Sequence, residues 1–272
     1  MITRRTFTSL AIPAVSAVLS GARAQAALDP QYRLIAHRGG IVDEQHAENS
    51  PGSLQAAIDR GYWMIEMDIR RTKDGEPILQ HDPNFRRFYN DERTVDQVTW
   101  SEAGRLRAKP GGTSPIHFRD VCKMCQGKIR VMLDIKGANF PDEFYANLRK
   151  LLADHSLLDT AYMLTGGPIA AKHLAPYCSI SCKRDSLRAA IARGEDVKSR
   201  YFLFEPAAEL NEESFELSRH AGVPAVASLA TFRYTMAKRD EWKGPEEDCA
   251  KMKKLGGRNF LLDSRHEAFF RV

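Results

Sequence analysis

Short β-rich runs alternate with helical patterns along the chain, and this alternation limits the fold more than any other feature of the sequence. The helical patterns repeat apolar residues at helical spacing, as at Phe144, Leu148, Leu151 and Leu152, or end on a glycine, as at Gly222. The β-rich runs lie at residues 33–36, 64–69, 129–135, 161–164, 179–183, 201–204, 224–227 and 259–262. Eight such units within about 246 residues predict an α/β fold of the (β/α)8 TIM-barrel type, which typically has about 250 residues. An open, doubly wound sheet is the alternative.

One interval breaks the regular alternation. Residues 72–118 are too many for a simple connection between a strand and a helix, so they predict a small insertion after the second strand. Two helix starts are also marked. Ser50 before Pro51 predicts an N-cap followed by a proline in the first turn, and Ser264 with Glu267 predicts a capping box for a short last helix. No Pro- or Ser-rich linker divides residues 27–272, which we treat as one domain.

The first 26 residues have the features of a cleavable signal peptide. A basic start is followed by an uncharged, largely apolar stretch at residues 9–20 and by small residues at positions 22, 24 and 26. The stretch is shorter than the roughly 18 residues that a membrane-spanning helix needs, so we expect no stable membrane anchor. The pair Arg4-Arg5 resembles the twin-arginine export signal of bacteria, with the general secretory machinery as the alternative. Either route predicts a periplasmic or secreted protein.

The charge of the chain argues against two classes of partner. Arg4, Arg5 and Arg23 fall in the predicted signal, which leaves 37 basic against 35 acidic side chains in residues 27–272. Such a near-neutral domain offers no electrostatic basis for binding nucleic acid. We also find no basic amphipathic helix for docking on a bilayer.

The cysteines do not predict a metal site. Five cysteines in an exported chain leave at least one unpaired. Cys122 and Cys125 have the spacing of a redox or zinc pair, but Cys178 and Cys182 follow much later and with a different spacing. We therefore expect small buried residues, with a local disulfide as an option.

Acidic residues interrupt two of the predicted strands. Glu66 and Asp68 alternate on one face of the second strand, and Asp134 shares a face with Lys136 on the third. A strand buried on both faces is expected to be continuously apolar, so these acids need compensation. A bound cation would supply it, and a set of carboxylates without thiolates suits Ca²⁺ or Mg²⁺. The alternative is a buried salt bridge of Glu66 or Asp68 with Arg38, Arg70 or Lys136.

Two histidines lie where they could act on a ligand of such a metal. His37 ends the first strand, and His81 follows a short apolar run that can return to the mouth of a barrel. With an unperturbed pKa near 6.5, an imidazole can accept or donate a proton at neutral pH. Taken alone, either histidine is more often a structural core or loop residue.

Several of these residues form a recognisable series. The motifs are His37-Arg38-Gly39, Glu48-Asn49-Ser50, Glu66-Met67-Asp68, Thr72-Lys73-Asp74-Gly75 and His81-Asp82. In order and approximate spacing they resemble the glycerophosphodiester phosphodiesterase family. The resemblance is densest over residues 35–82, continues over 114–136 and returns at Leu262-Asp263.

The resemblance implies a metal-dependent barrel that hydrolyses glycerophosphodiesters, such as glycerophosphocholine, to glycerol 3-phosphate and an alcohol. It implies one divalent cation, Ca²⁺ or Mg²⁺, at positions that match Glu66, Asp68 and Asp134. It further implies general acid and base roles for His37 and His81, without deciding which is which. Arg38 and Lys136 would contact the phosphate, and Glu48 and Asn49 would support the ligands and contact the substrate.

The sequence departs from the family pattern at three places. The third acid is commonly glutamate, and Asp134 is one methylene shorter. The loop after His37 is slightly long and contains His46, which is a rival to His81. The seventh strand lacks the usual Trp-Thr run, which leaves the identity of the alcohol open. Two alternatives follow: a related barrel phospholipase or sphingomyelinase D that cleaves intact lipids, and a noncatalytic periplasmic protein that binds phosphodiesters.

Overall fold

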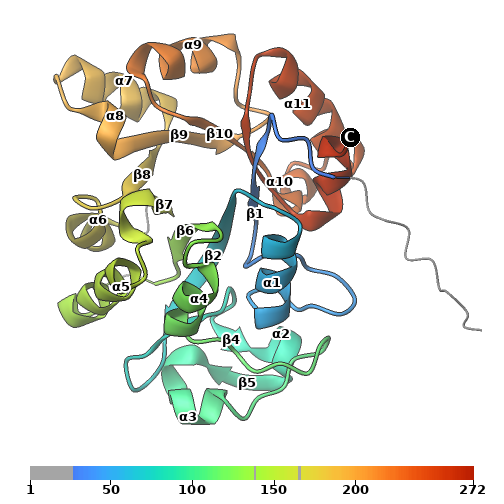
Figure 1. Cartoon of the computed structure of the whole chain (residues 1–272), viewed down its shortest axis with the longest axis vertical. Coiled ribbons are helices and arrows are strands. Elements are labelled where there is room, and N and C mark those ends of the chain that lie inside the picture. Colours follow the sequence, from blue (N-terminus) through green and yellow to red (C-terminus); the bar gives the residue numbers. More distant parts are fainter. Residues whose placement is uncertain (1–26, 138, 165–166) are drawn as a thin grey trace, which may run out of the picture.

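The computed structural model describes residues 27–137, 139–164 and 167–272, so the predicted signal peptide lies outside the described residues. Its main feature is a ring of eight parallel strands (Figure 1). They are β1 (Arg33–Ala36), β2 (Met64–Arg71), β6 (Arg130–Ile135), β7 (Tyr162–Leu164), β8 (Ser179–Cys182), β9 (Tyr201–Pro206), β10 (Ala225–Leu229) and β11 (Asn259–Leu262). Because β1 pairs with both β11 and β2, the sheet closes. All eight predicted strands and the TIM barrel are confirmed, and the open sheet is excluded.

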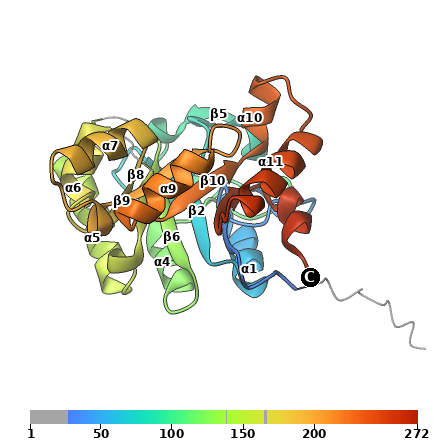
Figure 2. The same ribbon diagram turned by 90° about the horizontal axis from the view of Figure 1, so that it is seen from above.

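Helices surround the ring of strands, as Figures 1 and 2 show. They are α1 (Pro51–Asp59), α4 (Phe118–Cys125), α5 (Asp142–Asp154), α6 (Pro168–Leu174), α7 (Arg184–Ala192), α8 (Val197–Arg200), α9 (Glu212–Ala221), α10 (Thr231–Met236) and α11 (Lys243–Lys254). Ser50 caps α1 as predicted, since its side chain accepts a hydrogen bond from the backbone of Ser53. Gly222 ends α9 with a φ of +68°, a conformation that glycine adopts without strain.

Two layers of apolar side chains lie on the two faces of the barrel strands. The outward face packs against the helices and forms the larger core. The inward face forms a smaller cluster that fills the barrel interior with Ile35, Met64, Met132, Tyr162, Phe202, Val226 and Leu261. Since side chains alternate along a strand, Glu66 and Asp68 follow Met64 on this inward face, and Asp134 follows Met132. The acids therefore stand on an apolar floor.

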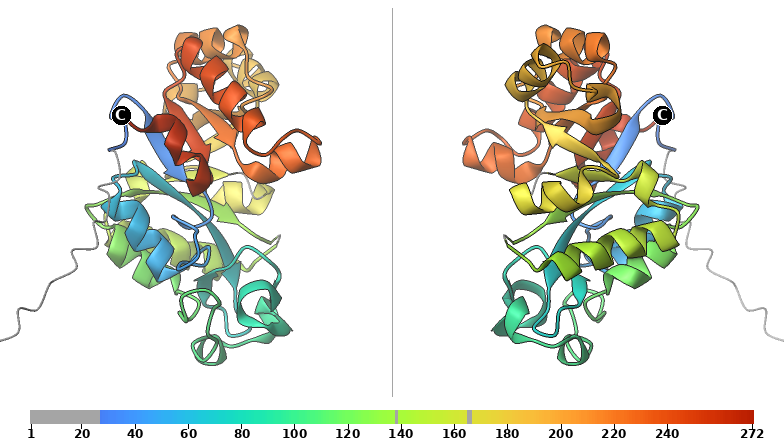
Figure 3. Two further views of the ribbon diagram at one scale, coloured as in Figure 1. Left: turned by 90° about the vertical axis from the view of Figure 1, so that its right-hand side faces the viewer. Right: turned by 90° about the vertical axis from the view of Figure 1, so that its left-hand side faces the viewer.

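The predicted insertion after the second strand is confirmed. The chain leaves β2 through the antiparallel strand β3 (Pro77–Leu79) and then forms a small lobe, drawn in cyan and green in Figure 3. The lobe contains β4 (Asn84–Phe85), α2 (Arg86–Tyr89), β5 (Asp91–Thr94), η1 (Val95–Gln97) and α3 (Trp100–Ala103). Its own apolar cluster includes Ile78, Phe85 and Val98.

The predicted capping box at Ser264 is wrong. The last element, η3 (Ser264–Phe270), is a 3-10 helix whose N-cap is Asp263, without a side-chain cap. The Ser264 hydroxyl instead bonds the backbone of Val42. Glu267 is drawn away by stronger partners, because it accepts hydrogen bonds from Arg60 and Tyr62. One further short helix, η2 (Leu158–Thr160), precedes β7.

All five cysteines are free thiols, so the optional disulfide does not form. Cys122 and Cys125 are buried on α4, and burial raises the pKa of the Cys125 thiol to about 12. Within the described ranges, no helix has the length and apolar character to cross a membrane.

Candidate active site

Three acids converge at the carboxyl ends of two neighbouring strands. Asp68 on β2 lies opposite Asp134 on β6 in the strand register, and Glu66 precedes Asp68 on the same face. One carboxylate oxygen from each of the three lies within 4.8 Å of the others. Glu66 and Asp68 are each only 1% exposed. The structure thus brings Glu66, Asp68 and Asp134, the predicted metal ligands, into one acid cluster.

The acid cluster is only partly neutralised by its neighbours. Lys136 Nζ lies 3.1 Å from an oxygen of Asp68 and 2.6 Å from an oxygen of Asp134. The Asn49 amide donates to the second oxygen of Asp68 at 2.8 Å. The salt bridge considered as the alternative to a metal therefore exists, but it leaves three carboxylates with one lysine.

Glu66 is the carboxylate that this arrangement leaves unsatisfied. Its Oε2 accepts a hydrogen bond from the backbone N–H of Arg38 at 2.8 Å, while its buried Oε1 has no partner among the described residues. Burial, followed by the nearby charges of Asp68 and Asp134, holds the pKa of Glu66 well above its usual value. A bound divalent cation would relieve both the repulsion and the missing contact. The donor set, made of carboxylate oxygens alone, fits a hard ion such as Ca²⁺ or Mg²⁺.

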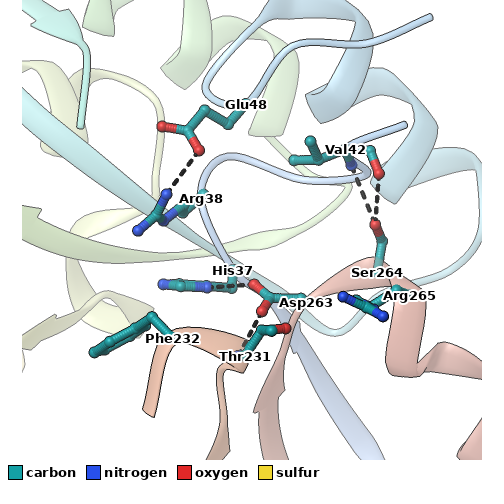
Figure 4. A pocket seen from close by; sticks show the side chains of 9 residues that line it. All are labelled: His37, Arg38, Val42, Glu48, Thr231, Phe232, Asp263, Ser264 and Arg265. Atoms are coloured by element: carbon teal, nitrogen blue, oxygen red, sulfur yellow. Dashed lines mark hydrogen bonds and ion pairs between the residues drawn. The ribbon is translucent and has the colours of Figure 1, made fainter. Parts of the chain in front are cut away.

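His37, at the end of β1, is held by a carboxylate on the neighbouring strand's end. Its Nδ1 lies 2.6 Å from Asp263, which directly follows β11, and the backbone N–H of Thr231 donates to the other oxygen of Asp263 at 2.7 Å (Figure 4). Burial would by itself raise the pKa of Asp263, but the hydrogen bond and charge of His37 outweigh it and hold that pKa well below its usual value. The Nε2 of His37 is left to face the pocket.

His81 is held in the same way from the other side of the mouth. The antiparallel strand β3 returns the chain to the barrel, and the His81 Nδ1 lies 2.8 Å from Asp82. Its Nε2 lies 3.3 Å from the guanidinium of Arg38. Both predicted acid–base histidines therefore have Nδ1 on an aspartate and Nε2 toward the mouth.

His81 and Asp82 belong to a closed ring of polar contacts, which we call the arginine ring: Arg38, Glu48, Arg87, Asp82 and His81. Arg38 pairs with Glu48 at 2.9 Å, and the other oxygen of Glu48 pairs with Arg87. Arg87 reaches Asp82 at 3.1 Å, and His81 closes the ring between Asp82 and Arg38. Two carboxylates thus face two guanidinium groups.

One pocket of about 320 Å³ joins these groups. Its lining includes the polar residues His37, Arg38, Glu66, His81, Asp134 and Lys136, together with Leu164, Phe204, Ser228, Ala230, Phe232, Arg233 and Leu261. His46 does not line this pocket. Its Nδ1 lies 2.9 Å from Asp43, and its ring packs against Gly52 at the start of α1.

Several residues of the mouth were not singled out by sequence reasoning. Asp263 was noted only as part of the resemblance, although it holds His37. Arg87, Phe232 and Arg233 lie in irregular or short helical segments, where no spacing pattern marks them. Of these residues, the strand pattern could have marked only Asp263, because it directly follows a β-rich run.

Two carboxylate-backed imidazoles lie beside an acid cluster at the end of a closed barrel where barrel enzymes carry their sites, an arrangement that suits general acid and base catalysis. Residues 37–148 match the model of the Glycerophosphoryl diester phosphodiesterase family. This segment contains both histidines and all three acids, so the part of the chain that carries the candidate site is similar to this family.

Individual relatives resemble the chain over part of their length. Human glycerophosphodiester phosphodiesterase 1 is 31% identical over 134 residues, which cover 48% of this chain and 33% of the relative. A mouse lysophospholipase D is 31% identical over 96 residues, covering 35% of this chain and 28% of the relative. The chain therefore matches about a third of the length of these curated relatives.

A solved structure extends the likeness over the whole barrel. A phosphodiesterase from Oleispira antarctica, solved with the product sn-glycerol-3-phosphate, superposes with a TM-score of 0.65 at 17% identity, over 87% of this chain and 96% of the other. At this identity the likeness concerns the fold.

Proposed function

We propose that the protein hydrolyses glycerophosphodiesters such as glycerophosphocholine to glycerol 3-phosphate and an alcohol, with one divalent cation, Ca²⁺ or Mg²⁺, as cofactor. The observation that carries the proposal is the unsatisfied, buried Glu66 in an acid cluster that shares a pocket with two carboxylate-backed imidazoles. The match of residues 37–148 to the family model and the glycerol phosphate product seen in the structurally similar Oleispira protein support the substrate class.

The residues divide the work on the phosphodiester. Glu66, Asp68 and Asp134 would hold the cation, which when bound draws negative charge from a nonbridging phosphate oxygen. Arg38 and Lys136 line the same pocket and add positive charge that stabilises the transition state. Asn49 keeps Asp68 in place through its amide.

The contacts of the two histidines favour different roles. A guanidinium can only donate hydrogen bonds, so Nε2 of His81 accepts from Arg38 and its proton lies on Nδ1, facing Asp82. When Arg38 turns to the substrate phosphate, the lone pair on this nitrogen becomes free, and Nε2 of His81 can then take a proton from water or from a neighbouring substrate hydroxyl. His37 has Nδ1 on Asp263 and Nε2 3.9 Å from an oxygen of Glu66 at the edge of the acid cluster, and we assign it the protonation of the departing alcohol.

The test is release of glycerol 3-phosphate from glycerophosphocholine with Ca²⁺, with Mg²⁺ and with a chelator. We expect product with at least one of the ions, none with the chelator, and none from His37→Ala, whose circular dichroism spectrum stays that of the wild type. Absence of product under every condition, together with tight binding of the substrate, would favour the noncatalytic binding protein instead.

A second candidate is cleavage of a lipid with an acyl chain. The apolar wall of the pocket continues onto α10, where Phe232 is 41% and Met236 78% exposed, and one relative is a lysophospholipase D. An assay with lysophosphatidylcholine and sphingomyelin beside glycerophosphocholine separates the candidates. Cleavage of these lipids without cleavage of glycerophosphocholine would support the phospholipase or sphingomyelinase D reading.

We also propose that residues 1–26 are a twin-arginine signal that directs the protein to the periplasm. The basis is the Arg4-Arg5 pair before an apolar stretch. A double Arg4→Lys, Arg5→Lys variant is expected to stay in the cytoplasm if the twin-arginine machinery is used, and to be exported normally if the general secretory route is used.

A further inference from the structure

Among the described residues Arg233, which lines the main pocket, has no acidic partner, unlike Arg38 and Arg87 of the barrel mouth. Arg38 pairs with Glu48, Arg87 with Glu48 and Asp82, and Arg70 donates to the backbone carbonyls of His81 and Lys136. Within the described residues, no carboxylate lies within ion-pair distance of Arg233. Its one hydrogen bond runs from Nε to the hydroxyl of Ser228 at 3.2 Å.

The guanidinium of Arg233 is also half-buried. It lies 5.1 Å from the centre of the Phe232 ring, and burial lowers its pKa, with the charge of Glu209 acting in the opposite direction. Glu209 is itself 4.0 Å from Lys183. A partly desolvated cation without a counter-ion is unfavourable, and both Nη groups are left to bind an anion side by side.

The position of Arg233 connects two cavities. Ser228, Phe232 and Arg233 line the main pocket and also an adjoining pocket of about 340 Å³, which extends past Glu209 and Met236. In the strand order, β10, which carries Ser228, lies four strands from β6, which carries Asp134. Arg233 therefore faces Lys136 from the opposite wall of the barrel mouth.

We propose that Arg233 forms a second anion-binding subsite, which takes a carboxylate on the alcohol part of the substrate. The inference rests on the proposed function, because the phosphate must lie between Arg38 and Lys136 for the alcohol to extend toward β10. The planar guanidinium of an arginine can donate two hydrogen bonds to one carboxylate. A choline group cannot accept them, because it is a cation without an acceptor atom. Glu209, in the adjoining pocket, adds an acid that can face the ammonium group of a serine head group.

The experiment compares glycerophosphoserine with glycerophosphoethanolamine, which differ only by the carboxylate. For the wild type, we expect kcat/KM to be at least about tenfold higher for glycerophosphoserine, the range of a charged hydrogen bond. In Arg233→Met this ratio should fall to about one, and Arg233→Lys should restore part of it. The matched control is Arg239→Met in the same segment. Arg239 also lines the adjoining pocket but is paired with Asp248, so its loss should leave the ratio unchanged.

The outcomes separate the subsite from the reaction. If both substrates are hydrolysed at a ratio near one by the wild type and by Arg233→Met, the subsite is refuted and the proposed function stands. If neither is hydrolysed, the proposed function fails. The subsite at Arg233 is then tested by comparing the affinities of phosphoserine and phosphoethanolamine in calorimetry. Equal binding of the two compounds would refute the subsite. A preference for a glycerophosphoglycerol with a second phosphate over glycerophosphoserine would mean that Arg233 binds a phosphate. This result would refute a carboxylate as its ligand.

Discussion

The two halves of the barrel mouth share one feature, a histidine paired with an aspartate, but they differ in the balance of charge around it. Each half has an imidazole whose Nδ1 lies on an aspartate, at 2.6 Å for His37 and 2.8 Å for His81. Beside His37, the acid cluster sets three carboxylates against Lys136. Beside His81, the arginine ring sets two carboxylates against two guanidinium groups.

This difference shows that proximity of acids does not by itself define a metal site. The side chains of Glu48, His81 and Asp82 lie as close together as those of the acid cluster. In the arginine ring, however, every carboxylate has a cationic partner, whereas Glu66 in the acid cluster has a buried oxygen without one. A divalent cation is therefore expected in the first half of the mouth and not in the second.

Among the variants that compare the two halves, the largest expected effect is that of Glu66→Gln, which removes one charge from the acid cluster with little change of shape. We expect kcat/KM for glycerophosphocholine to fall about 1,000-fold and the rise in Tm on adding Ca²⁺ or Mg²⁺ to disappear. The control is Glu48→Gln in the arginine ring, which should retain the metal-dependent rise. If the Tm of Glu66→Gln rises on adding the ion as much as that of the wild type, the cation binds elsewhere.

Next in size is His81→Gln, which removes the imidazole of the arginine ring. We expect kcat to fall about 100-fold, the lower end of what a general acid or base contributes. His46→Gln serves as the comparison and should change kcat by less than about twofold, since His46 does not line the pocket. The reverse result would give the second proton-transfer role to His46.

A smaller effect is expected from Arg87→Met, which opens the arginine ring while leaving the acid cluster intact. Because Glu48 and Asp82 then lose one partner, Arg38 and His81 are held less firmly, and kcat should fall about tenfold with the metal-dependent rise in Tm unchanged. Arg86→Met is the matched control, since the neighbouring Arg86 pairs with Glu92 on the exposed surface. Equal behaviour of the two variants would mean that the ring has no positioning role.

The smallest effect concerns pH and compares the two aspartates behind the histidines. The pKa of Asp263 is lowered in the folded protein, so its charge contributes stability above the unfolded-state pKa of about 3.9, and this contribution is lost as the pH falls below that value. Urea unfolding at pH 6, 4 and 3 should show Asp263→Asn about 1 kcal/mol less stable at pH 6, with a smaller difference at pH 3. Asp82→Asn should show a weaker trend, because the pKa of Asp82 is lowered less than that of Asp263. A pH-independent difference would mean that the charge of Asp263 is not involved.

The fold could be predicted because each barrel strand carries its own local signal. The runs at 33–36 and 259–262 coincide with β1 and β11, since apolar residues bounded by turns form buried parallel strands. The capping box at Ser264 failed for a physical reason. A cap is a local preference, and Glu267 found stronger partners in Arg60 and Tyr62, which are distant in sequence.

The site was predictable where its residues end strands. Glu66, Asp68, Asp134 and His37 follow from this rule, because the carboxyl ends of barrel strands meet at one mouth. Arg87 and Arg233 did not follow from it, since one lies in the irregular insertion and the other in a short helix after β10. Their partners are set by how these segments fold back on the mouth, which no residue spacing expresses.

The apolar residues below the acid cluster affect how ligands enter and leave the site. Met64, Met132, Phe202 and Val226 plug the barrel from below, so ions and water reach the carboxylates from one direction only. Under the proposed function, the incoming diester and the two outgoing products would share this one opening, and an alcohol bound at Arg233 would block the entry of the next diester. Release at the rim, rather than bond cleavage at the floor, is then the step that a bulky or charged alcohol would slow.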